Sequence, residues 1–294
     1  MAAIKCILGL LVLFAVSAWT EAMVVRRESG DDDIEDEGIL TVAEQLEKAN
    51  RNIIVPIIVT SDYLWCLCCF HKLSAGLYQD GFQIIGDIAV PINRNADPCV
   101  QRGCKWPKSS DGKVYIPYVI ANSYTSQQVD IITSSLNSFS TSTCIRFIPR
   151  TTQTNYIDIQ STLGCYSLVG FQSGRQRVSL DSAGCIKFGT VQHELIHVLG
   201  FNHEQCRSDR DQHIKILLQN VIPAQQYNFD KINTLNQGTP YDYNSVMHYG
   251  RLAFSKDNVS PTMVAIPDSN AVFGTATQMS QNDIDRINLL YCSK

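Results

Sequence analysis

The sequence of 294 residues lacks the features typical of nucleic-acid-binding and membrane-spanning proteins. Its formal net charge is −4 and it has no long basic run, which argues against a polyanionic partner. Beyond the N-terminus, no apolar segment is long enough to cross a bilayer. From Asn95 onward there is no internal repeat, no low-complexity segment, and no serine or cysteine placed as a nucleophile. With an ordinary hydrophobic fraction of 45%, the chain is expected to form one or two globular domains.

The N-terminus is the exception to this lack of apolar runs. The residues from Cys6 to Val16 are apolar, follow Lys5, and precede small residues that end at Ala18. This run is too short to span a bilayer and is typical of a secretory signal peptide. We therefore predict cleavage after Ala18, with Ala22 as the alternative, and a secreted protein.

The stretch HELIHVLGFNHE, which begins at His193, carries the chemistry of the chain. On a helix, His193 and His197 lie on one face and can direct their imidazoles at a single metal ion. If that helix continued, His203 would lie about 9 Å further along and about 120° round the axis. Gly200 removes this obstacle, because glycine adopts the left-handed conformation that ends a helix. Three imidazoles with one open position predict a catalytic zinc site, in which Glu194 reaches a metal-bound water rather than the metal.

The longer pattern H-E-x-x-H-x-x-G-x-x-H is similar to that of the metzincins. Downstream, the run from Ser245 to Tyr249, SVMHY, resembles the Met-turn of that group, with Met247 as an apolar base below the metal. The run GFNHEQCRSDRD, from Gly200 to Asp211, and Tyr249 itself narrow the resemblance to the astacin family of zinc endopeptidases. The resemblance covers the chain from roughly Asn95 to the C-terminus. Within the family, hatching enzymes (choriolysins) and nephrosin-type proteases look most similar.

The resemblance implies an α+β fold with the site in its N-terminal half. That half is expected to hold a twisted, mostly parallel sheet with an antiparallel edge strand and the zinc-binding helix, followed by an irregular C-terminal half with a final helix. The implied domains are a signal peptide at 1–18, a propeptide at 19–94 and a peptidase domain at 95–294. Arg177–Leu180 is expected to be an edge strand with which substrate pairs.

Local patterns predict several individual elements. An amphipathic helix is expected over Leu40–Ala49, and further helices are expected to begin at caps formed by Thr125, Thr190 and Ser280. The helix that follows Thr190 is the predicted zinc helix. Strands are expected at 113–120, 144–148 and 156–160.

The resemblance also implies roles for four residues outside the histidines. Glu194 takes a proton from a zinc-bound water as general base and returns it to the leaving amine. Tyr249 helps to stabilise the oxyanion, and in the family it is a fifth zinc ligand that swings away when substrate binds; without the resemblance it is a core aromatic. Asp87, in Gly86–Ile88, resembles the prosegment aspartate that binds zinc in place of the catalytic water, whereas alone this tripeptide is an ordinary turn. Glu204 is expected to face the N-terminus made by prosegment cleavage.

The chain has eleven cysteines, and their spacing does not decide how they pair. Cys6 belongs to the signal peptide, and the cluster Cys66, Cys68 and Cys69 matches no zinc-finger or disulfide pattern and is assigned no function. Of the seven that remain, six can pair in 15 ways. The resemblance implies the disulfides Cys99–Cys104, Cys144–Cys292 and Cys165–Cys185. Cys206 is left over where Ser or Thr is expected, as a buried free thiol, an alternative zinc ligand or a dimer contact.

Together these features predict a secreted, monomeric zinc metalloendopeptidase with one Zn²⁺ per subunit, made as a zymogen and stored in secretory granules. Its expected partners are an activating protease and protein substrates, chiefly egg-envelope glycoproteins at hatching, with no nucleic acid and no membrane span. Two alternatives stay open: a nephrosin-like immune or tissue protease, and an inactive secreted binding protein. Glu194 argues against the latter, because a purely structural zinc site has no use for a base. No EGF-like or CUB-like module follows Cys292, so a minimal enzyme is expected.

Overall fold

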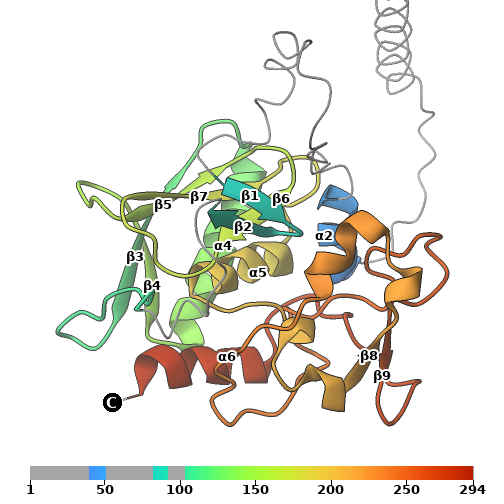
Figure 1. Ribbon diagram of the computed structural model, residues 1–294. Coiled ribbons are helices and arrows are strands. Elements are labelled where there is room, and N and C mark those ends of the chain that lie inside the picture. Colours follow the sequence, from blue (N-terminus) through green and yellow to red (C-terminus); the bar gives the residue numbers. More distant parts are fainter. Residues whose placement is uncertain (1–39, 51–81, 92–102, 294) are drawn as a thin grey trace, which may run out of the picture. The chain divides into compact units, whose positions relative to one another are not determined.

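A seven-stranded mixed sheet organises the N-terminal half of the computed structural model, which describes residues 40–50, 82–91 and 103–293 (Figure 1). Its strands are β1 (Phe82–Ile85), β2 (Ile88–Pro91), β3 (Val114–Ile120), β4 (Ile145–Pro149), β5 (Tyr156–Gln160), β6 (Cys165–Leu168) and β7 (Arg175–Leu180). The predicted signal peptide, the cysteine cluster at 66–69, the expected mature start at Asn95, and Cys99 lie outside the described residues.

The strand order is β1-β2-β6-β7-β5-β3-β4. Strands β7, β5, β3 and β4 are mutually parallel, β6 runs antiparallel to β7, and the β1–β2 hairpin joins β6 through a parallel pairing of β2. The predicted α+β fold with a mostly parallel sheet and an antiparallel strand is therefore confirmed. The β1–β2 hairpin, which lies N-terminal to residue 103, is therefore attached to the rest of the sheet through β6.

The prediction that Arg177–Leu180 forms an edge strand is wrong, because β7 is hydrogen-bonded to β5 on one side and to β6 on the other. Polar side chains of this strand are satisfied inside the protein. Gln176 is buried and its Nε2 donates to Gly170 O at 2.9 Å, and buried Ser179 donates through Oγ to Gly164 O at 2.7 Å. A polar strand residue therefore does not mark an edge when loop carbonyls lie within reach.

Two helices, α4 (Ser126–Ser142) and α5 (Phe188–Val198), pack on each other and against the sheet (Figure 1). The predicted cap of α4 is confirmed: Thr125 and Gln128 form a capping box. Helix α4 buries the apolar side chains of Ile132, Leu136 and Phe139. The core of this half thus lies between α4, α5 and the sheet.

The prediction that Thr190 caps the zinc helix is wrong. Helix α5 begins at Phe188, and its N-cap residue, Lys187, makes no side-chain cap. Thr190 is the third residue of the helix, within its first turn and fully buried, and its hydroxyl donates to Gln45 Oε1 at 2.6 Å. The Thr190 hydroxyl therefore forms a hydrogen bond to another helix and does not cap the end of its own.

That other helix is α2 (Val42–Asn50), which matches the helix predicted over 40–49. It contacts α5 and β6. Val42 N donates to Ala276 O at 2.8 Å, so α2 also touches the C-terminal half. At its other end, the Asn50 carboxamide exchanges two hydrogen bonds of 2.8 Å each with the backbone of Cys165. Helix α2 therefore joins segments from both halves of the chain.

The C-terminal half has little regular structure, as predicted. It contains a two-stranded sheet of β8 (Ile214–Ile216) and β9 (Met263–Ala265) and the short 3-10 helices η2 (Glu204–Cys206), η3 (Arg210–Gln212), η4 (Leu218–Asn220) and η5 (Pro223–Phe229). The final helix, α6 (Gln281–Ile287), continues as η6 (Asn288–Cys292) and begins with the predicted capping box of Ser280 and Asp283. Ile287 and Tyr291 are buried against the core.

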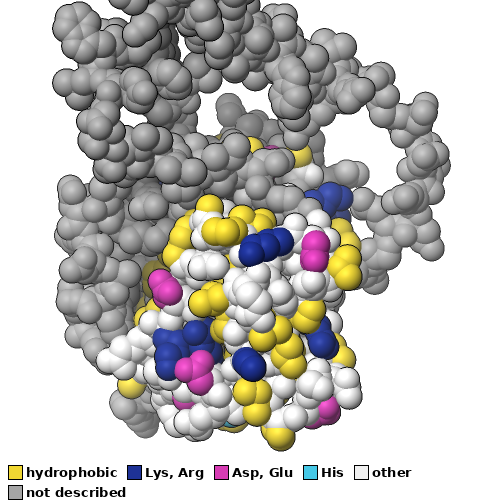
Figure 2. Space-filling model, turned by 45° about the vertical axis from the view of Figure 1, so that its right-hand side comes forward, with side chains coloured by type: hydrophobic (Ala, Val, Ile, Leu, Met, Phe, Trp, Pro, Cys, Tyr) yellow, Lys and Arg dark blue, Asp and Glu magenta, His cyan; other side chains and the backbone are white. Residues whose placement is uncertain are grey.

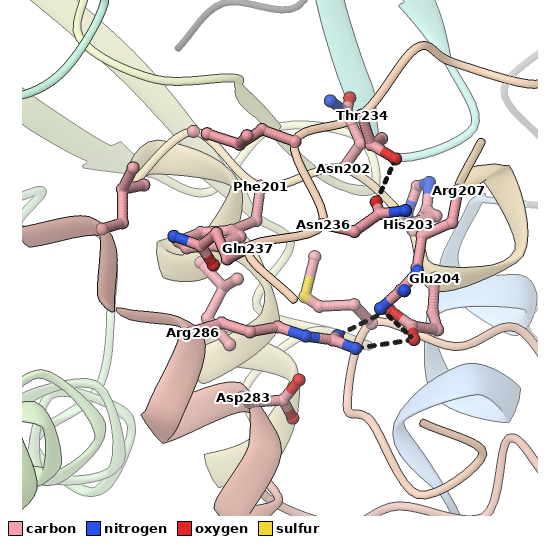
Figure 3. A pocket seen from close by; sticks show the side chains of 15 residues that line it. Phe201, Asn202, His203, Glu204, Arg207, Thr234, Asn236, Gln237, Asp283 and Arg286 are labelled. Atoms are coloured by element: carbon pink, nitrogen blue, oxygen red, sulfur yellow. Dashed lines mark hydrogen bonds and ion pairs between the residues drawn. The ribbon is translucent and has the colours of Figure 1, made fainter. Parts of the chain in front are cut away.

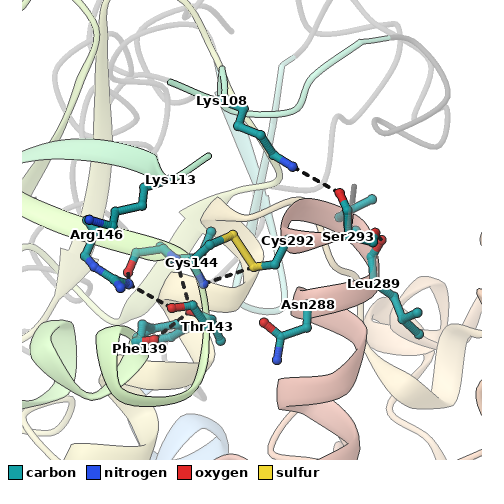
Figure 4. The surroundings of a disulfide bond; sticks show 12 residues. Lys108, Lys113, Phe139, Thr143, Cys144, Arg146, Asn288, Leu289, Cys292 and Ser293 are labelled. Carbon is teal, nitrogen blue, oxygen red and sulfur yellow. Dashed lines mark hydrogen bonds between the residues drawn. A yellow bond between two sulfur atoms is a disulfide. The ribbon is translucent and has the colours of Figure 1, made fainter. Parts of the chain in front are cut away.

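Two disulfides tie these elements together. Cys144–Cys292 links the start of β4 to the end of η6, where Cys144 N also donates to Cys292 Sγ at 3.0 Å (Figure 4). Cys165–Cys185 links β6 to the loop before α5. Cys104 is disulfide-bonded as well, while Cys206 is a buried free thiol. The two disulfides with known partners close loops of 148 and 20 residues, and such cross-links stabilise a fold mainly by restricting its unfolded chain.

None of the described helices is long and apolar enough to cross a membrane. On the face drawn in Figure 2, Lys and Arg side chains are scattered among apolar and uncharged ones and form no continuous basic patch.

Candidate metal centre

Three histidines meet at the end of α5. His193 and His197 lie on one face of the helix, and Gly200, with φ of +100°, turns the chain so that His203 joins them. All three side chains are buried. Nδ1 of His193 lies 2.7 Å from Val246 O and Nδ1 of His197 lies 2.8 Å from Phe201 O. Since carbonyl oxygens only accept, Nδ1 carries the proton in both rings and Nε2 keeps a free lone pair.

The fourth member of the cluster is Asp87, from the turn between β1 and β2. Its Oδ2 lies 3.0 Å from His193 Nε2, and its Oδ1 lies 2.8 Å from His203 Nε2 and 3.9 Å from His197 Nε2. These contacts lack hydrogen-bond geometry, because the three Nε2 atoms and Oδ2 have no hydrogen-bond partner among the described residues. The four ligand atoms lie within 4.8 Å of one another. Groups arranged in this way point at a common centre, and three imidazoles with a carboxylate suit Zn²⁺.

Electrostatics favour the protonation states that a metal requires. Burial lowers the pKa of His197 and His203, so both imidazoles are neutral at neutral pH. Burial opposes the ionisation of Asp87, but positive charge on the His203 and His193 rings outweighs this and holds the pKa of the carboxyl well below its usual value. A bound metal ion would supply that positive charge when the imidazoles are neutral. Neutral imidazoles and an ionised carboxylate are the ligand forms of these side chains.

Glu194, the next residue after His193, has a buried carboxylate whose two oxygens have no hydrogen-bond partner among the described residues. Burial, followed by the charge of Asp87, raises the pKa of Glu194 well above its usual value. An unpaired buried carboxylate beside a metal cluster is rare in purely structural sites. It fits a group that exchanges protons.

Tyr249 packs on the same cluster. Its ring centroid lies 4.4 Å from that of His203, and its hydroxyl donates to Asp87 Oδ1 at 3.3 Å. Burial, together with the charge of Asp87, raises the pKa of this phenol, so the hydroxyl keeps its proton. The structure thus places the predicted tyrosine beside the predicted ligands.

The turn that contains Met247 contacts the histidines through Val246, whose carbonyl oxygen lies 2.7 Å from His193 Nδ1, and α6 holds this turn in place. Asp283 accepts from Ser245 Oγ at 2.6 Å and from Val246 N at 2.9 Å, in addition to its part in the helix cap. Ser245 Oγ in turn accepts from Met247 N at 3.0 Å. The sequence predicts the cap but not this second use of Asp283, because the turn and the cap are far apart in the chain.

Glu204 follows His203 and lines a pocket of about 760 Å³ next to the cluster (Figure 3). Arg286 pairs with its carboxylate at 2.6 and 2.9 Å, Asp242 N donates to it at 2.7 Å, and Arg207 contacts it at 3.3 Å. Sequence reasoning missed Arg286, which has no local pattern that marks it. The predicted encounter of Glu204 with a new N-terminus stays a prediction, and that N-terminus would meet a carboxylate already paired with arginine.

The other two histidines of this part of the chain and Cys206 lie outside the cluster. His248 Nε2 is hydrogen-bonded to the Tyr241 hydroxyl at 2.8 Å, and the His213 ring stacks on Tyr241. Cys206 Sγ donates to Asn228 O at 3.3 Å, and burial raises its pKa to about 12. A protonated thiol that is already engaged does not bind zinc, so the structure favours the buried free thiol among the three alternatives.

Comparison with known proteins gives consistent matches. The family model described as astacin, a peptidase family, matches residues 101–292. High choriolytic enzyme 1 of Oryzias latipes is 46% identical over 223 residues, which are 74% of this chain and 81% of the relative. Low choriolytic enzyme of the same fish is 46% identical over 208 residues, 70% of this chain and 76% of the relative. The solved structure of high choriolytic enzyme 1, described as a hatching enzyme zinc-protease, matches with a TM-score of 0.65 over 68% of this chain and 100% of that one.

Proposed function

This chain belongs to the astacin family of peptidases and is a zinc metalloendopeptidase, and from this premise we propose that it is a secreted zymogen that digests egg-envelope proteins at hatching. The observation that carries the proposal is Asp87, whose carboxylate fills the space between the three histidines of a chain related to choriolytic enzymes.

The proposed latency is supported by the position of the β1–β2 hairpin, which brings Asp87 to the three histidines. In the proposed zymogen, residues 19–94 form the propeptide, and Asp87 takes the position that a catalytic water needs. Cleavage after Arg94 would free Asn95 as the new N-terminus and allow the hairpin to leave. The hairpin is joined to the peptidase domain by one strand pairing, β2 with β6, so its release disrupts no interior strand.

The residues that remain can carry out peptide hydrolysis. Zinc held by His193, His197 and His203 would polarise a bound water and the scissile carbonyl. The Glu194 carboxylate, whose oxygens have no hydrogen-bond partner among the described residues, takes the proton from the water as general base and delivers it to the leaving amine. The Tyr249 hydroxyl, which keeps its proton, donates a hydrogen bond to the developing oxyanion.

Secretion and storage are supported by the disulfides. Two disulfides and the bonded Cys104 fit an oxidising compartment. A latent form is suited to storage in secretory granules before release. The egg-envelope substrate is proposed by analogy with the choriolytic enzymes to which this chain is similar, and an activating protease is the expected partner.

The test uses full-length secreted protein, activated with trypsin because Arg94 precedes the proposed cleavage point. Isolated fish egg envelope and casein serve as substrates, with and without a chelator, and Glu194→Gln is the inactive control. Chelator-sensitive softening of the envelope, absent in the control, is expected. Digestion of casein alone would overturn the hatching role and favour a nephrosin-like tissue protease, and no turnover of either substrate would favour the binding-protein alternative.

A further inference from the structure

A buried, unpaired acceptor faces the metal centre from the C-terminal half. Asn228, near the end of η5, is 5% exposed, and its Oδ1 has no hydrogen-bond partner among the described residues. The carboxamide is placed by a hydrogen bond in which its Nδ2 donates to Gln225 Oε1 at 2.8 Å, and that same oxygen accepts from the Tyr227 hydroxyl at 3.3 Å. Gln225 therefore offers an acceptor, and Oδ1 of Asn228 must point the other way.

The direction in which Oδ1 points is given by Gly86. A Cβ atom at position 86 would lie 3.1 Å from Asn228 Oδ1 and 2.6 Å from the Tyr249 hydroxyl. The carboxamide oxygen and the hydroxyl thus face the same side of one residue, the neighbour of the carboxylate among the histidines. Gly86, with φ of +63°, is needed there both for its backbone conformation and for its lack of a side chain.

When the hairpin leaves, Oδ1 and the hydroxyl face the space that Gly86 occupied. They form a matched pair, since the hydroxyl donates and Oδ1 accepts. A peptide unit offers the complementary pair, because its carbonyl accepts and its N–H donates. The space is adjacent to the metal centre, so the chain that fills it during catalysis is the substrate backbone beside the scissile bond.

We propose that Asn228 Oδ1 accepts a backbone N–H of the peptide substrate next to the scissile bond, and so positions the scissile carbonyl for the Tyr249 hydroxyl and the metal centre. This inference rests on the proposed role of the metal centre in peptide hydrolysis. It explains why a buried acceptor is left unpaired in the latent form. In that form Gly86 lies beside Oδ1, and Oδ1 has no hydrogen-bond partner among the described residues.

The test measures binding rather than turnover. Trypsin-activated Glu194→Gln protein, loaded with zinc, binds a fluorescent peptide whose dissociation constant is measured by anisotropy. A series of peptides replaces one backbone N–H at a time near the scissile bond with an ester oxygen. At one position the ester is expected to weaken binding by about three- to tenfold, the usual range for one hydrogen bond. In the Glu194→Gln/Asn228→Leu double variant, the all-amide peptide is expected to bind more weakly by that same factor. Replacing the N–H by an ester oxygen is then expected to cause no further weakening of binding.

Matched variants separate positioning from folding. Asn228→Asp keeps an acceptor, and Gln225→Leu loses the same Gln225–Asn228 bond but keeps Oδ1, so both are expected to retain the response to the ester. Zymogen melting temperatures check that each variant folds. Equal ester penalties at every position, with and without the Asn228→Leu substitution, would overturn the proposal. Loss of chelator-sensitive casein digestion by the activated wild-type chain would instead overturn the proposed function, which distinguishes the two failures.

Discussion

The proposed propeptide has two described parts, the β1–β2 hairpin and helix α2. They contact the peptidase domain in different ways. The hairpin reaches the chemistry: Asp87 enters the histidine cluster and only one strand pairing supports it. Helix α2 brings no group to that cluster, but it buries Val42 and Leu46 in the same core as α5. We therefore expect inhibition and attachment to be carried by separate segments, each of which can be disturbed without the other.

The largest effect is expected from Asp87→Ala, which removes the group that blocks the metal while α2 stays attached. The uncleaved chain is expected to gain peptidase activity by about tenfold or more, equivalent to about 1.4 kcal/mol of lost inhibition. Peptide turnover by full-length protein, with Arg94→Ala added to prevent cleavage after Arg94, measures it. Unchanged latency would mean that coverage of the cleft, and not the carboxylate, inhibits the enzyme.

Leu46→Ala is expected to disturb attachment instead of inhibition. Deleting a buried leucine side chain costs about 2–5 kcal/mol, so the zymogen should melt at a lower temperature. Asp87 is untouched, so the uncleaved protein should stay latent at 25 °C. Calorimetry together with the turnover assay tests both statements, with the exposed Lys48→Ala as control. If uncleaved Leu46→Ala protein gained as much activity as Asp87→Ala, helix α2 would contribute to inhibition as much as the hairpin does, and the two segments would not have separate roles.

Gln45→Ala should give a smaller effect of the same kind. It leaves the buried Thr190 hydroxyl without the acceptor at 2.6 Å, at a cost of about 1–2 kcal/mol. In a Thr190→Val background the cost should largely disappear, because no hydroxyl is then stranded. Urea unfolding of the wild-type zymogen, the two single variants and the double variant gives the free energies of unfolding for a double-mutant cycle. An equal loss of stability from Gln45→Ala in both backgrounds would mean that Gln45 acts through packing and not through this hydrogen bond.

The smallest expected effect is at Cys206, which belongs to neither segment. Burial raises its pKa to about 12, so the folded protein holds it as a neutral thiol. Because the folded pKa lies above the unfolded one, the stabilising contribution is complete below about pH 9 and declines as the pH rises toward 12. A thiol reagent at pH 8 should leave the native protein unlabelled and react only after denaturation; rapid labelling of native protein would show that the thiol is accessible.

Sequence patterns predicted the features whose cause is local. The spacing of His193 and His197, the turn at Gly200 and the helix caps at Thr125 and Ser280 each depend on residues a few positions apart, and the structure reproduces them.

The errors and omissions have distant causes. Strand β7 acquires two neighbours and Thr190 finds its acceptor in α2, neither of which a local pattern can indicate. Arg286 meets Glu204 across 82 positions of the chain. Asn228 is identified only by its close approach to Gly86 in the fold, because no local sequence pattern distinguishes an asparagine in a polar loop.

Helix α2 also determines what happens after the proposed cleavage. While the chain is intact, the propeptide is an intramolecular ligand at a high effective concentration set by its tether. A single cut after Arg94 breaks no contact of α2 and none of Asp87, so it converts the propeptide into a free ligand that still fits at both places. Its occupancy then depends on dilution. Enzyme concentrated in a granule would stay largely inhibited by its own severed propeptide, and release into a large volume would complete activation without a second cut.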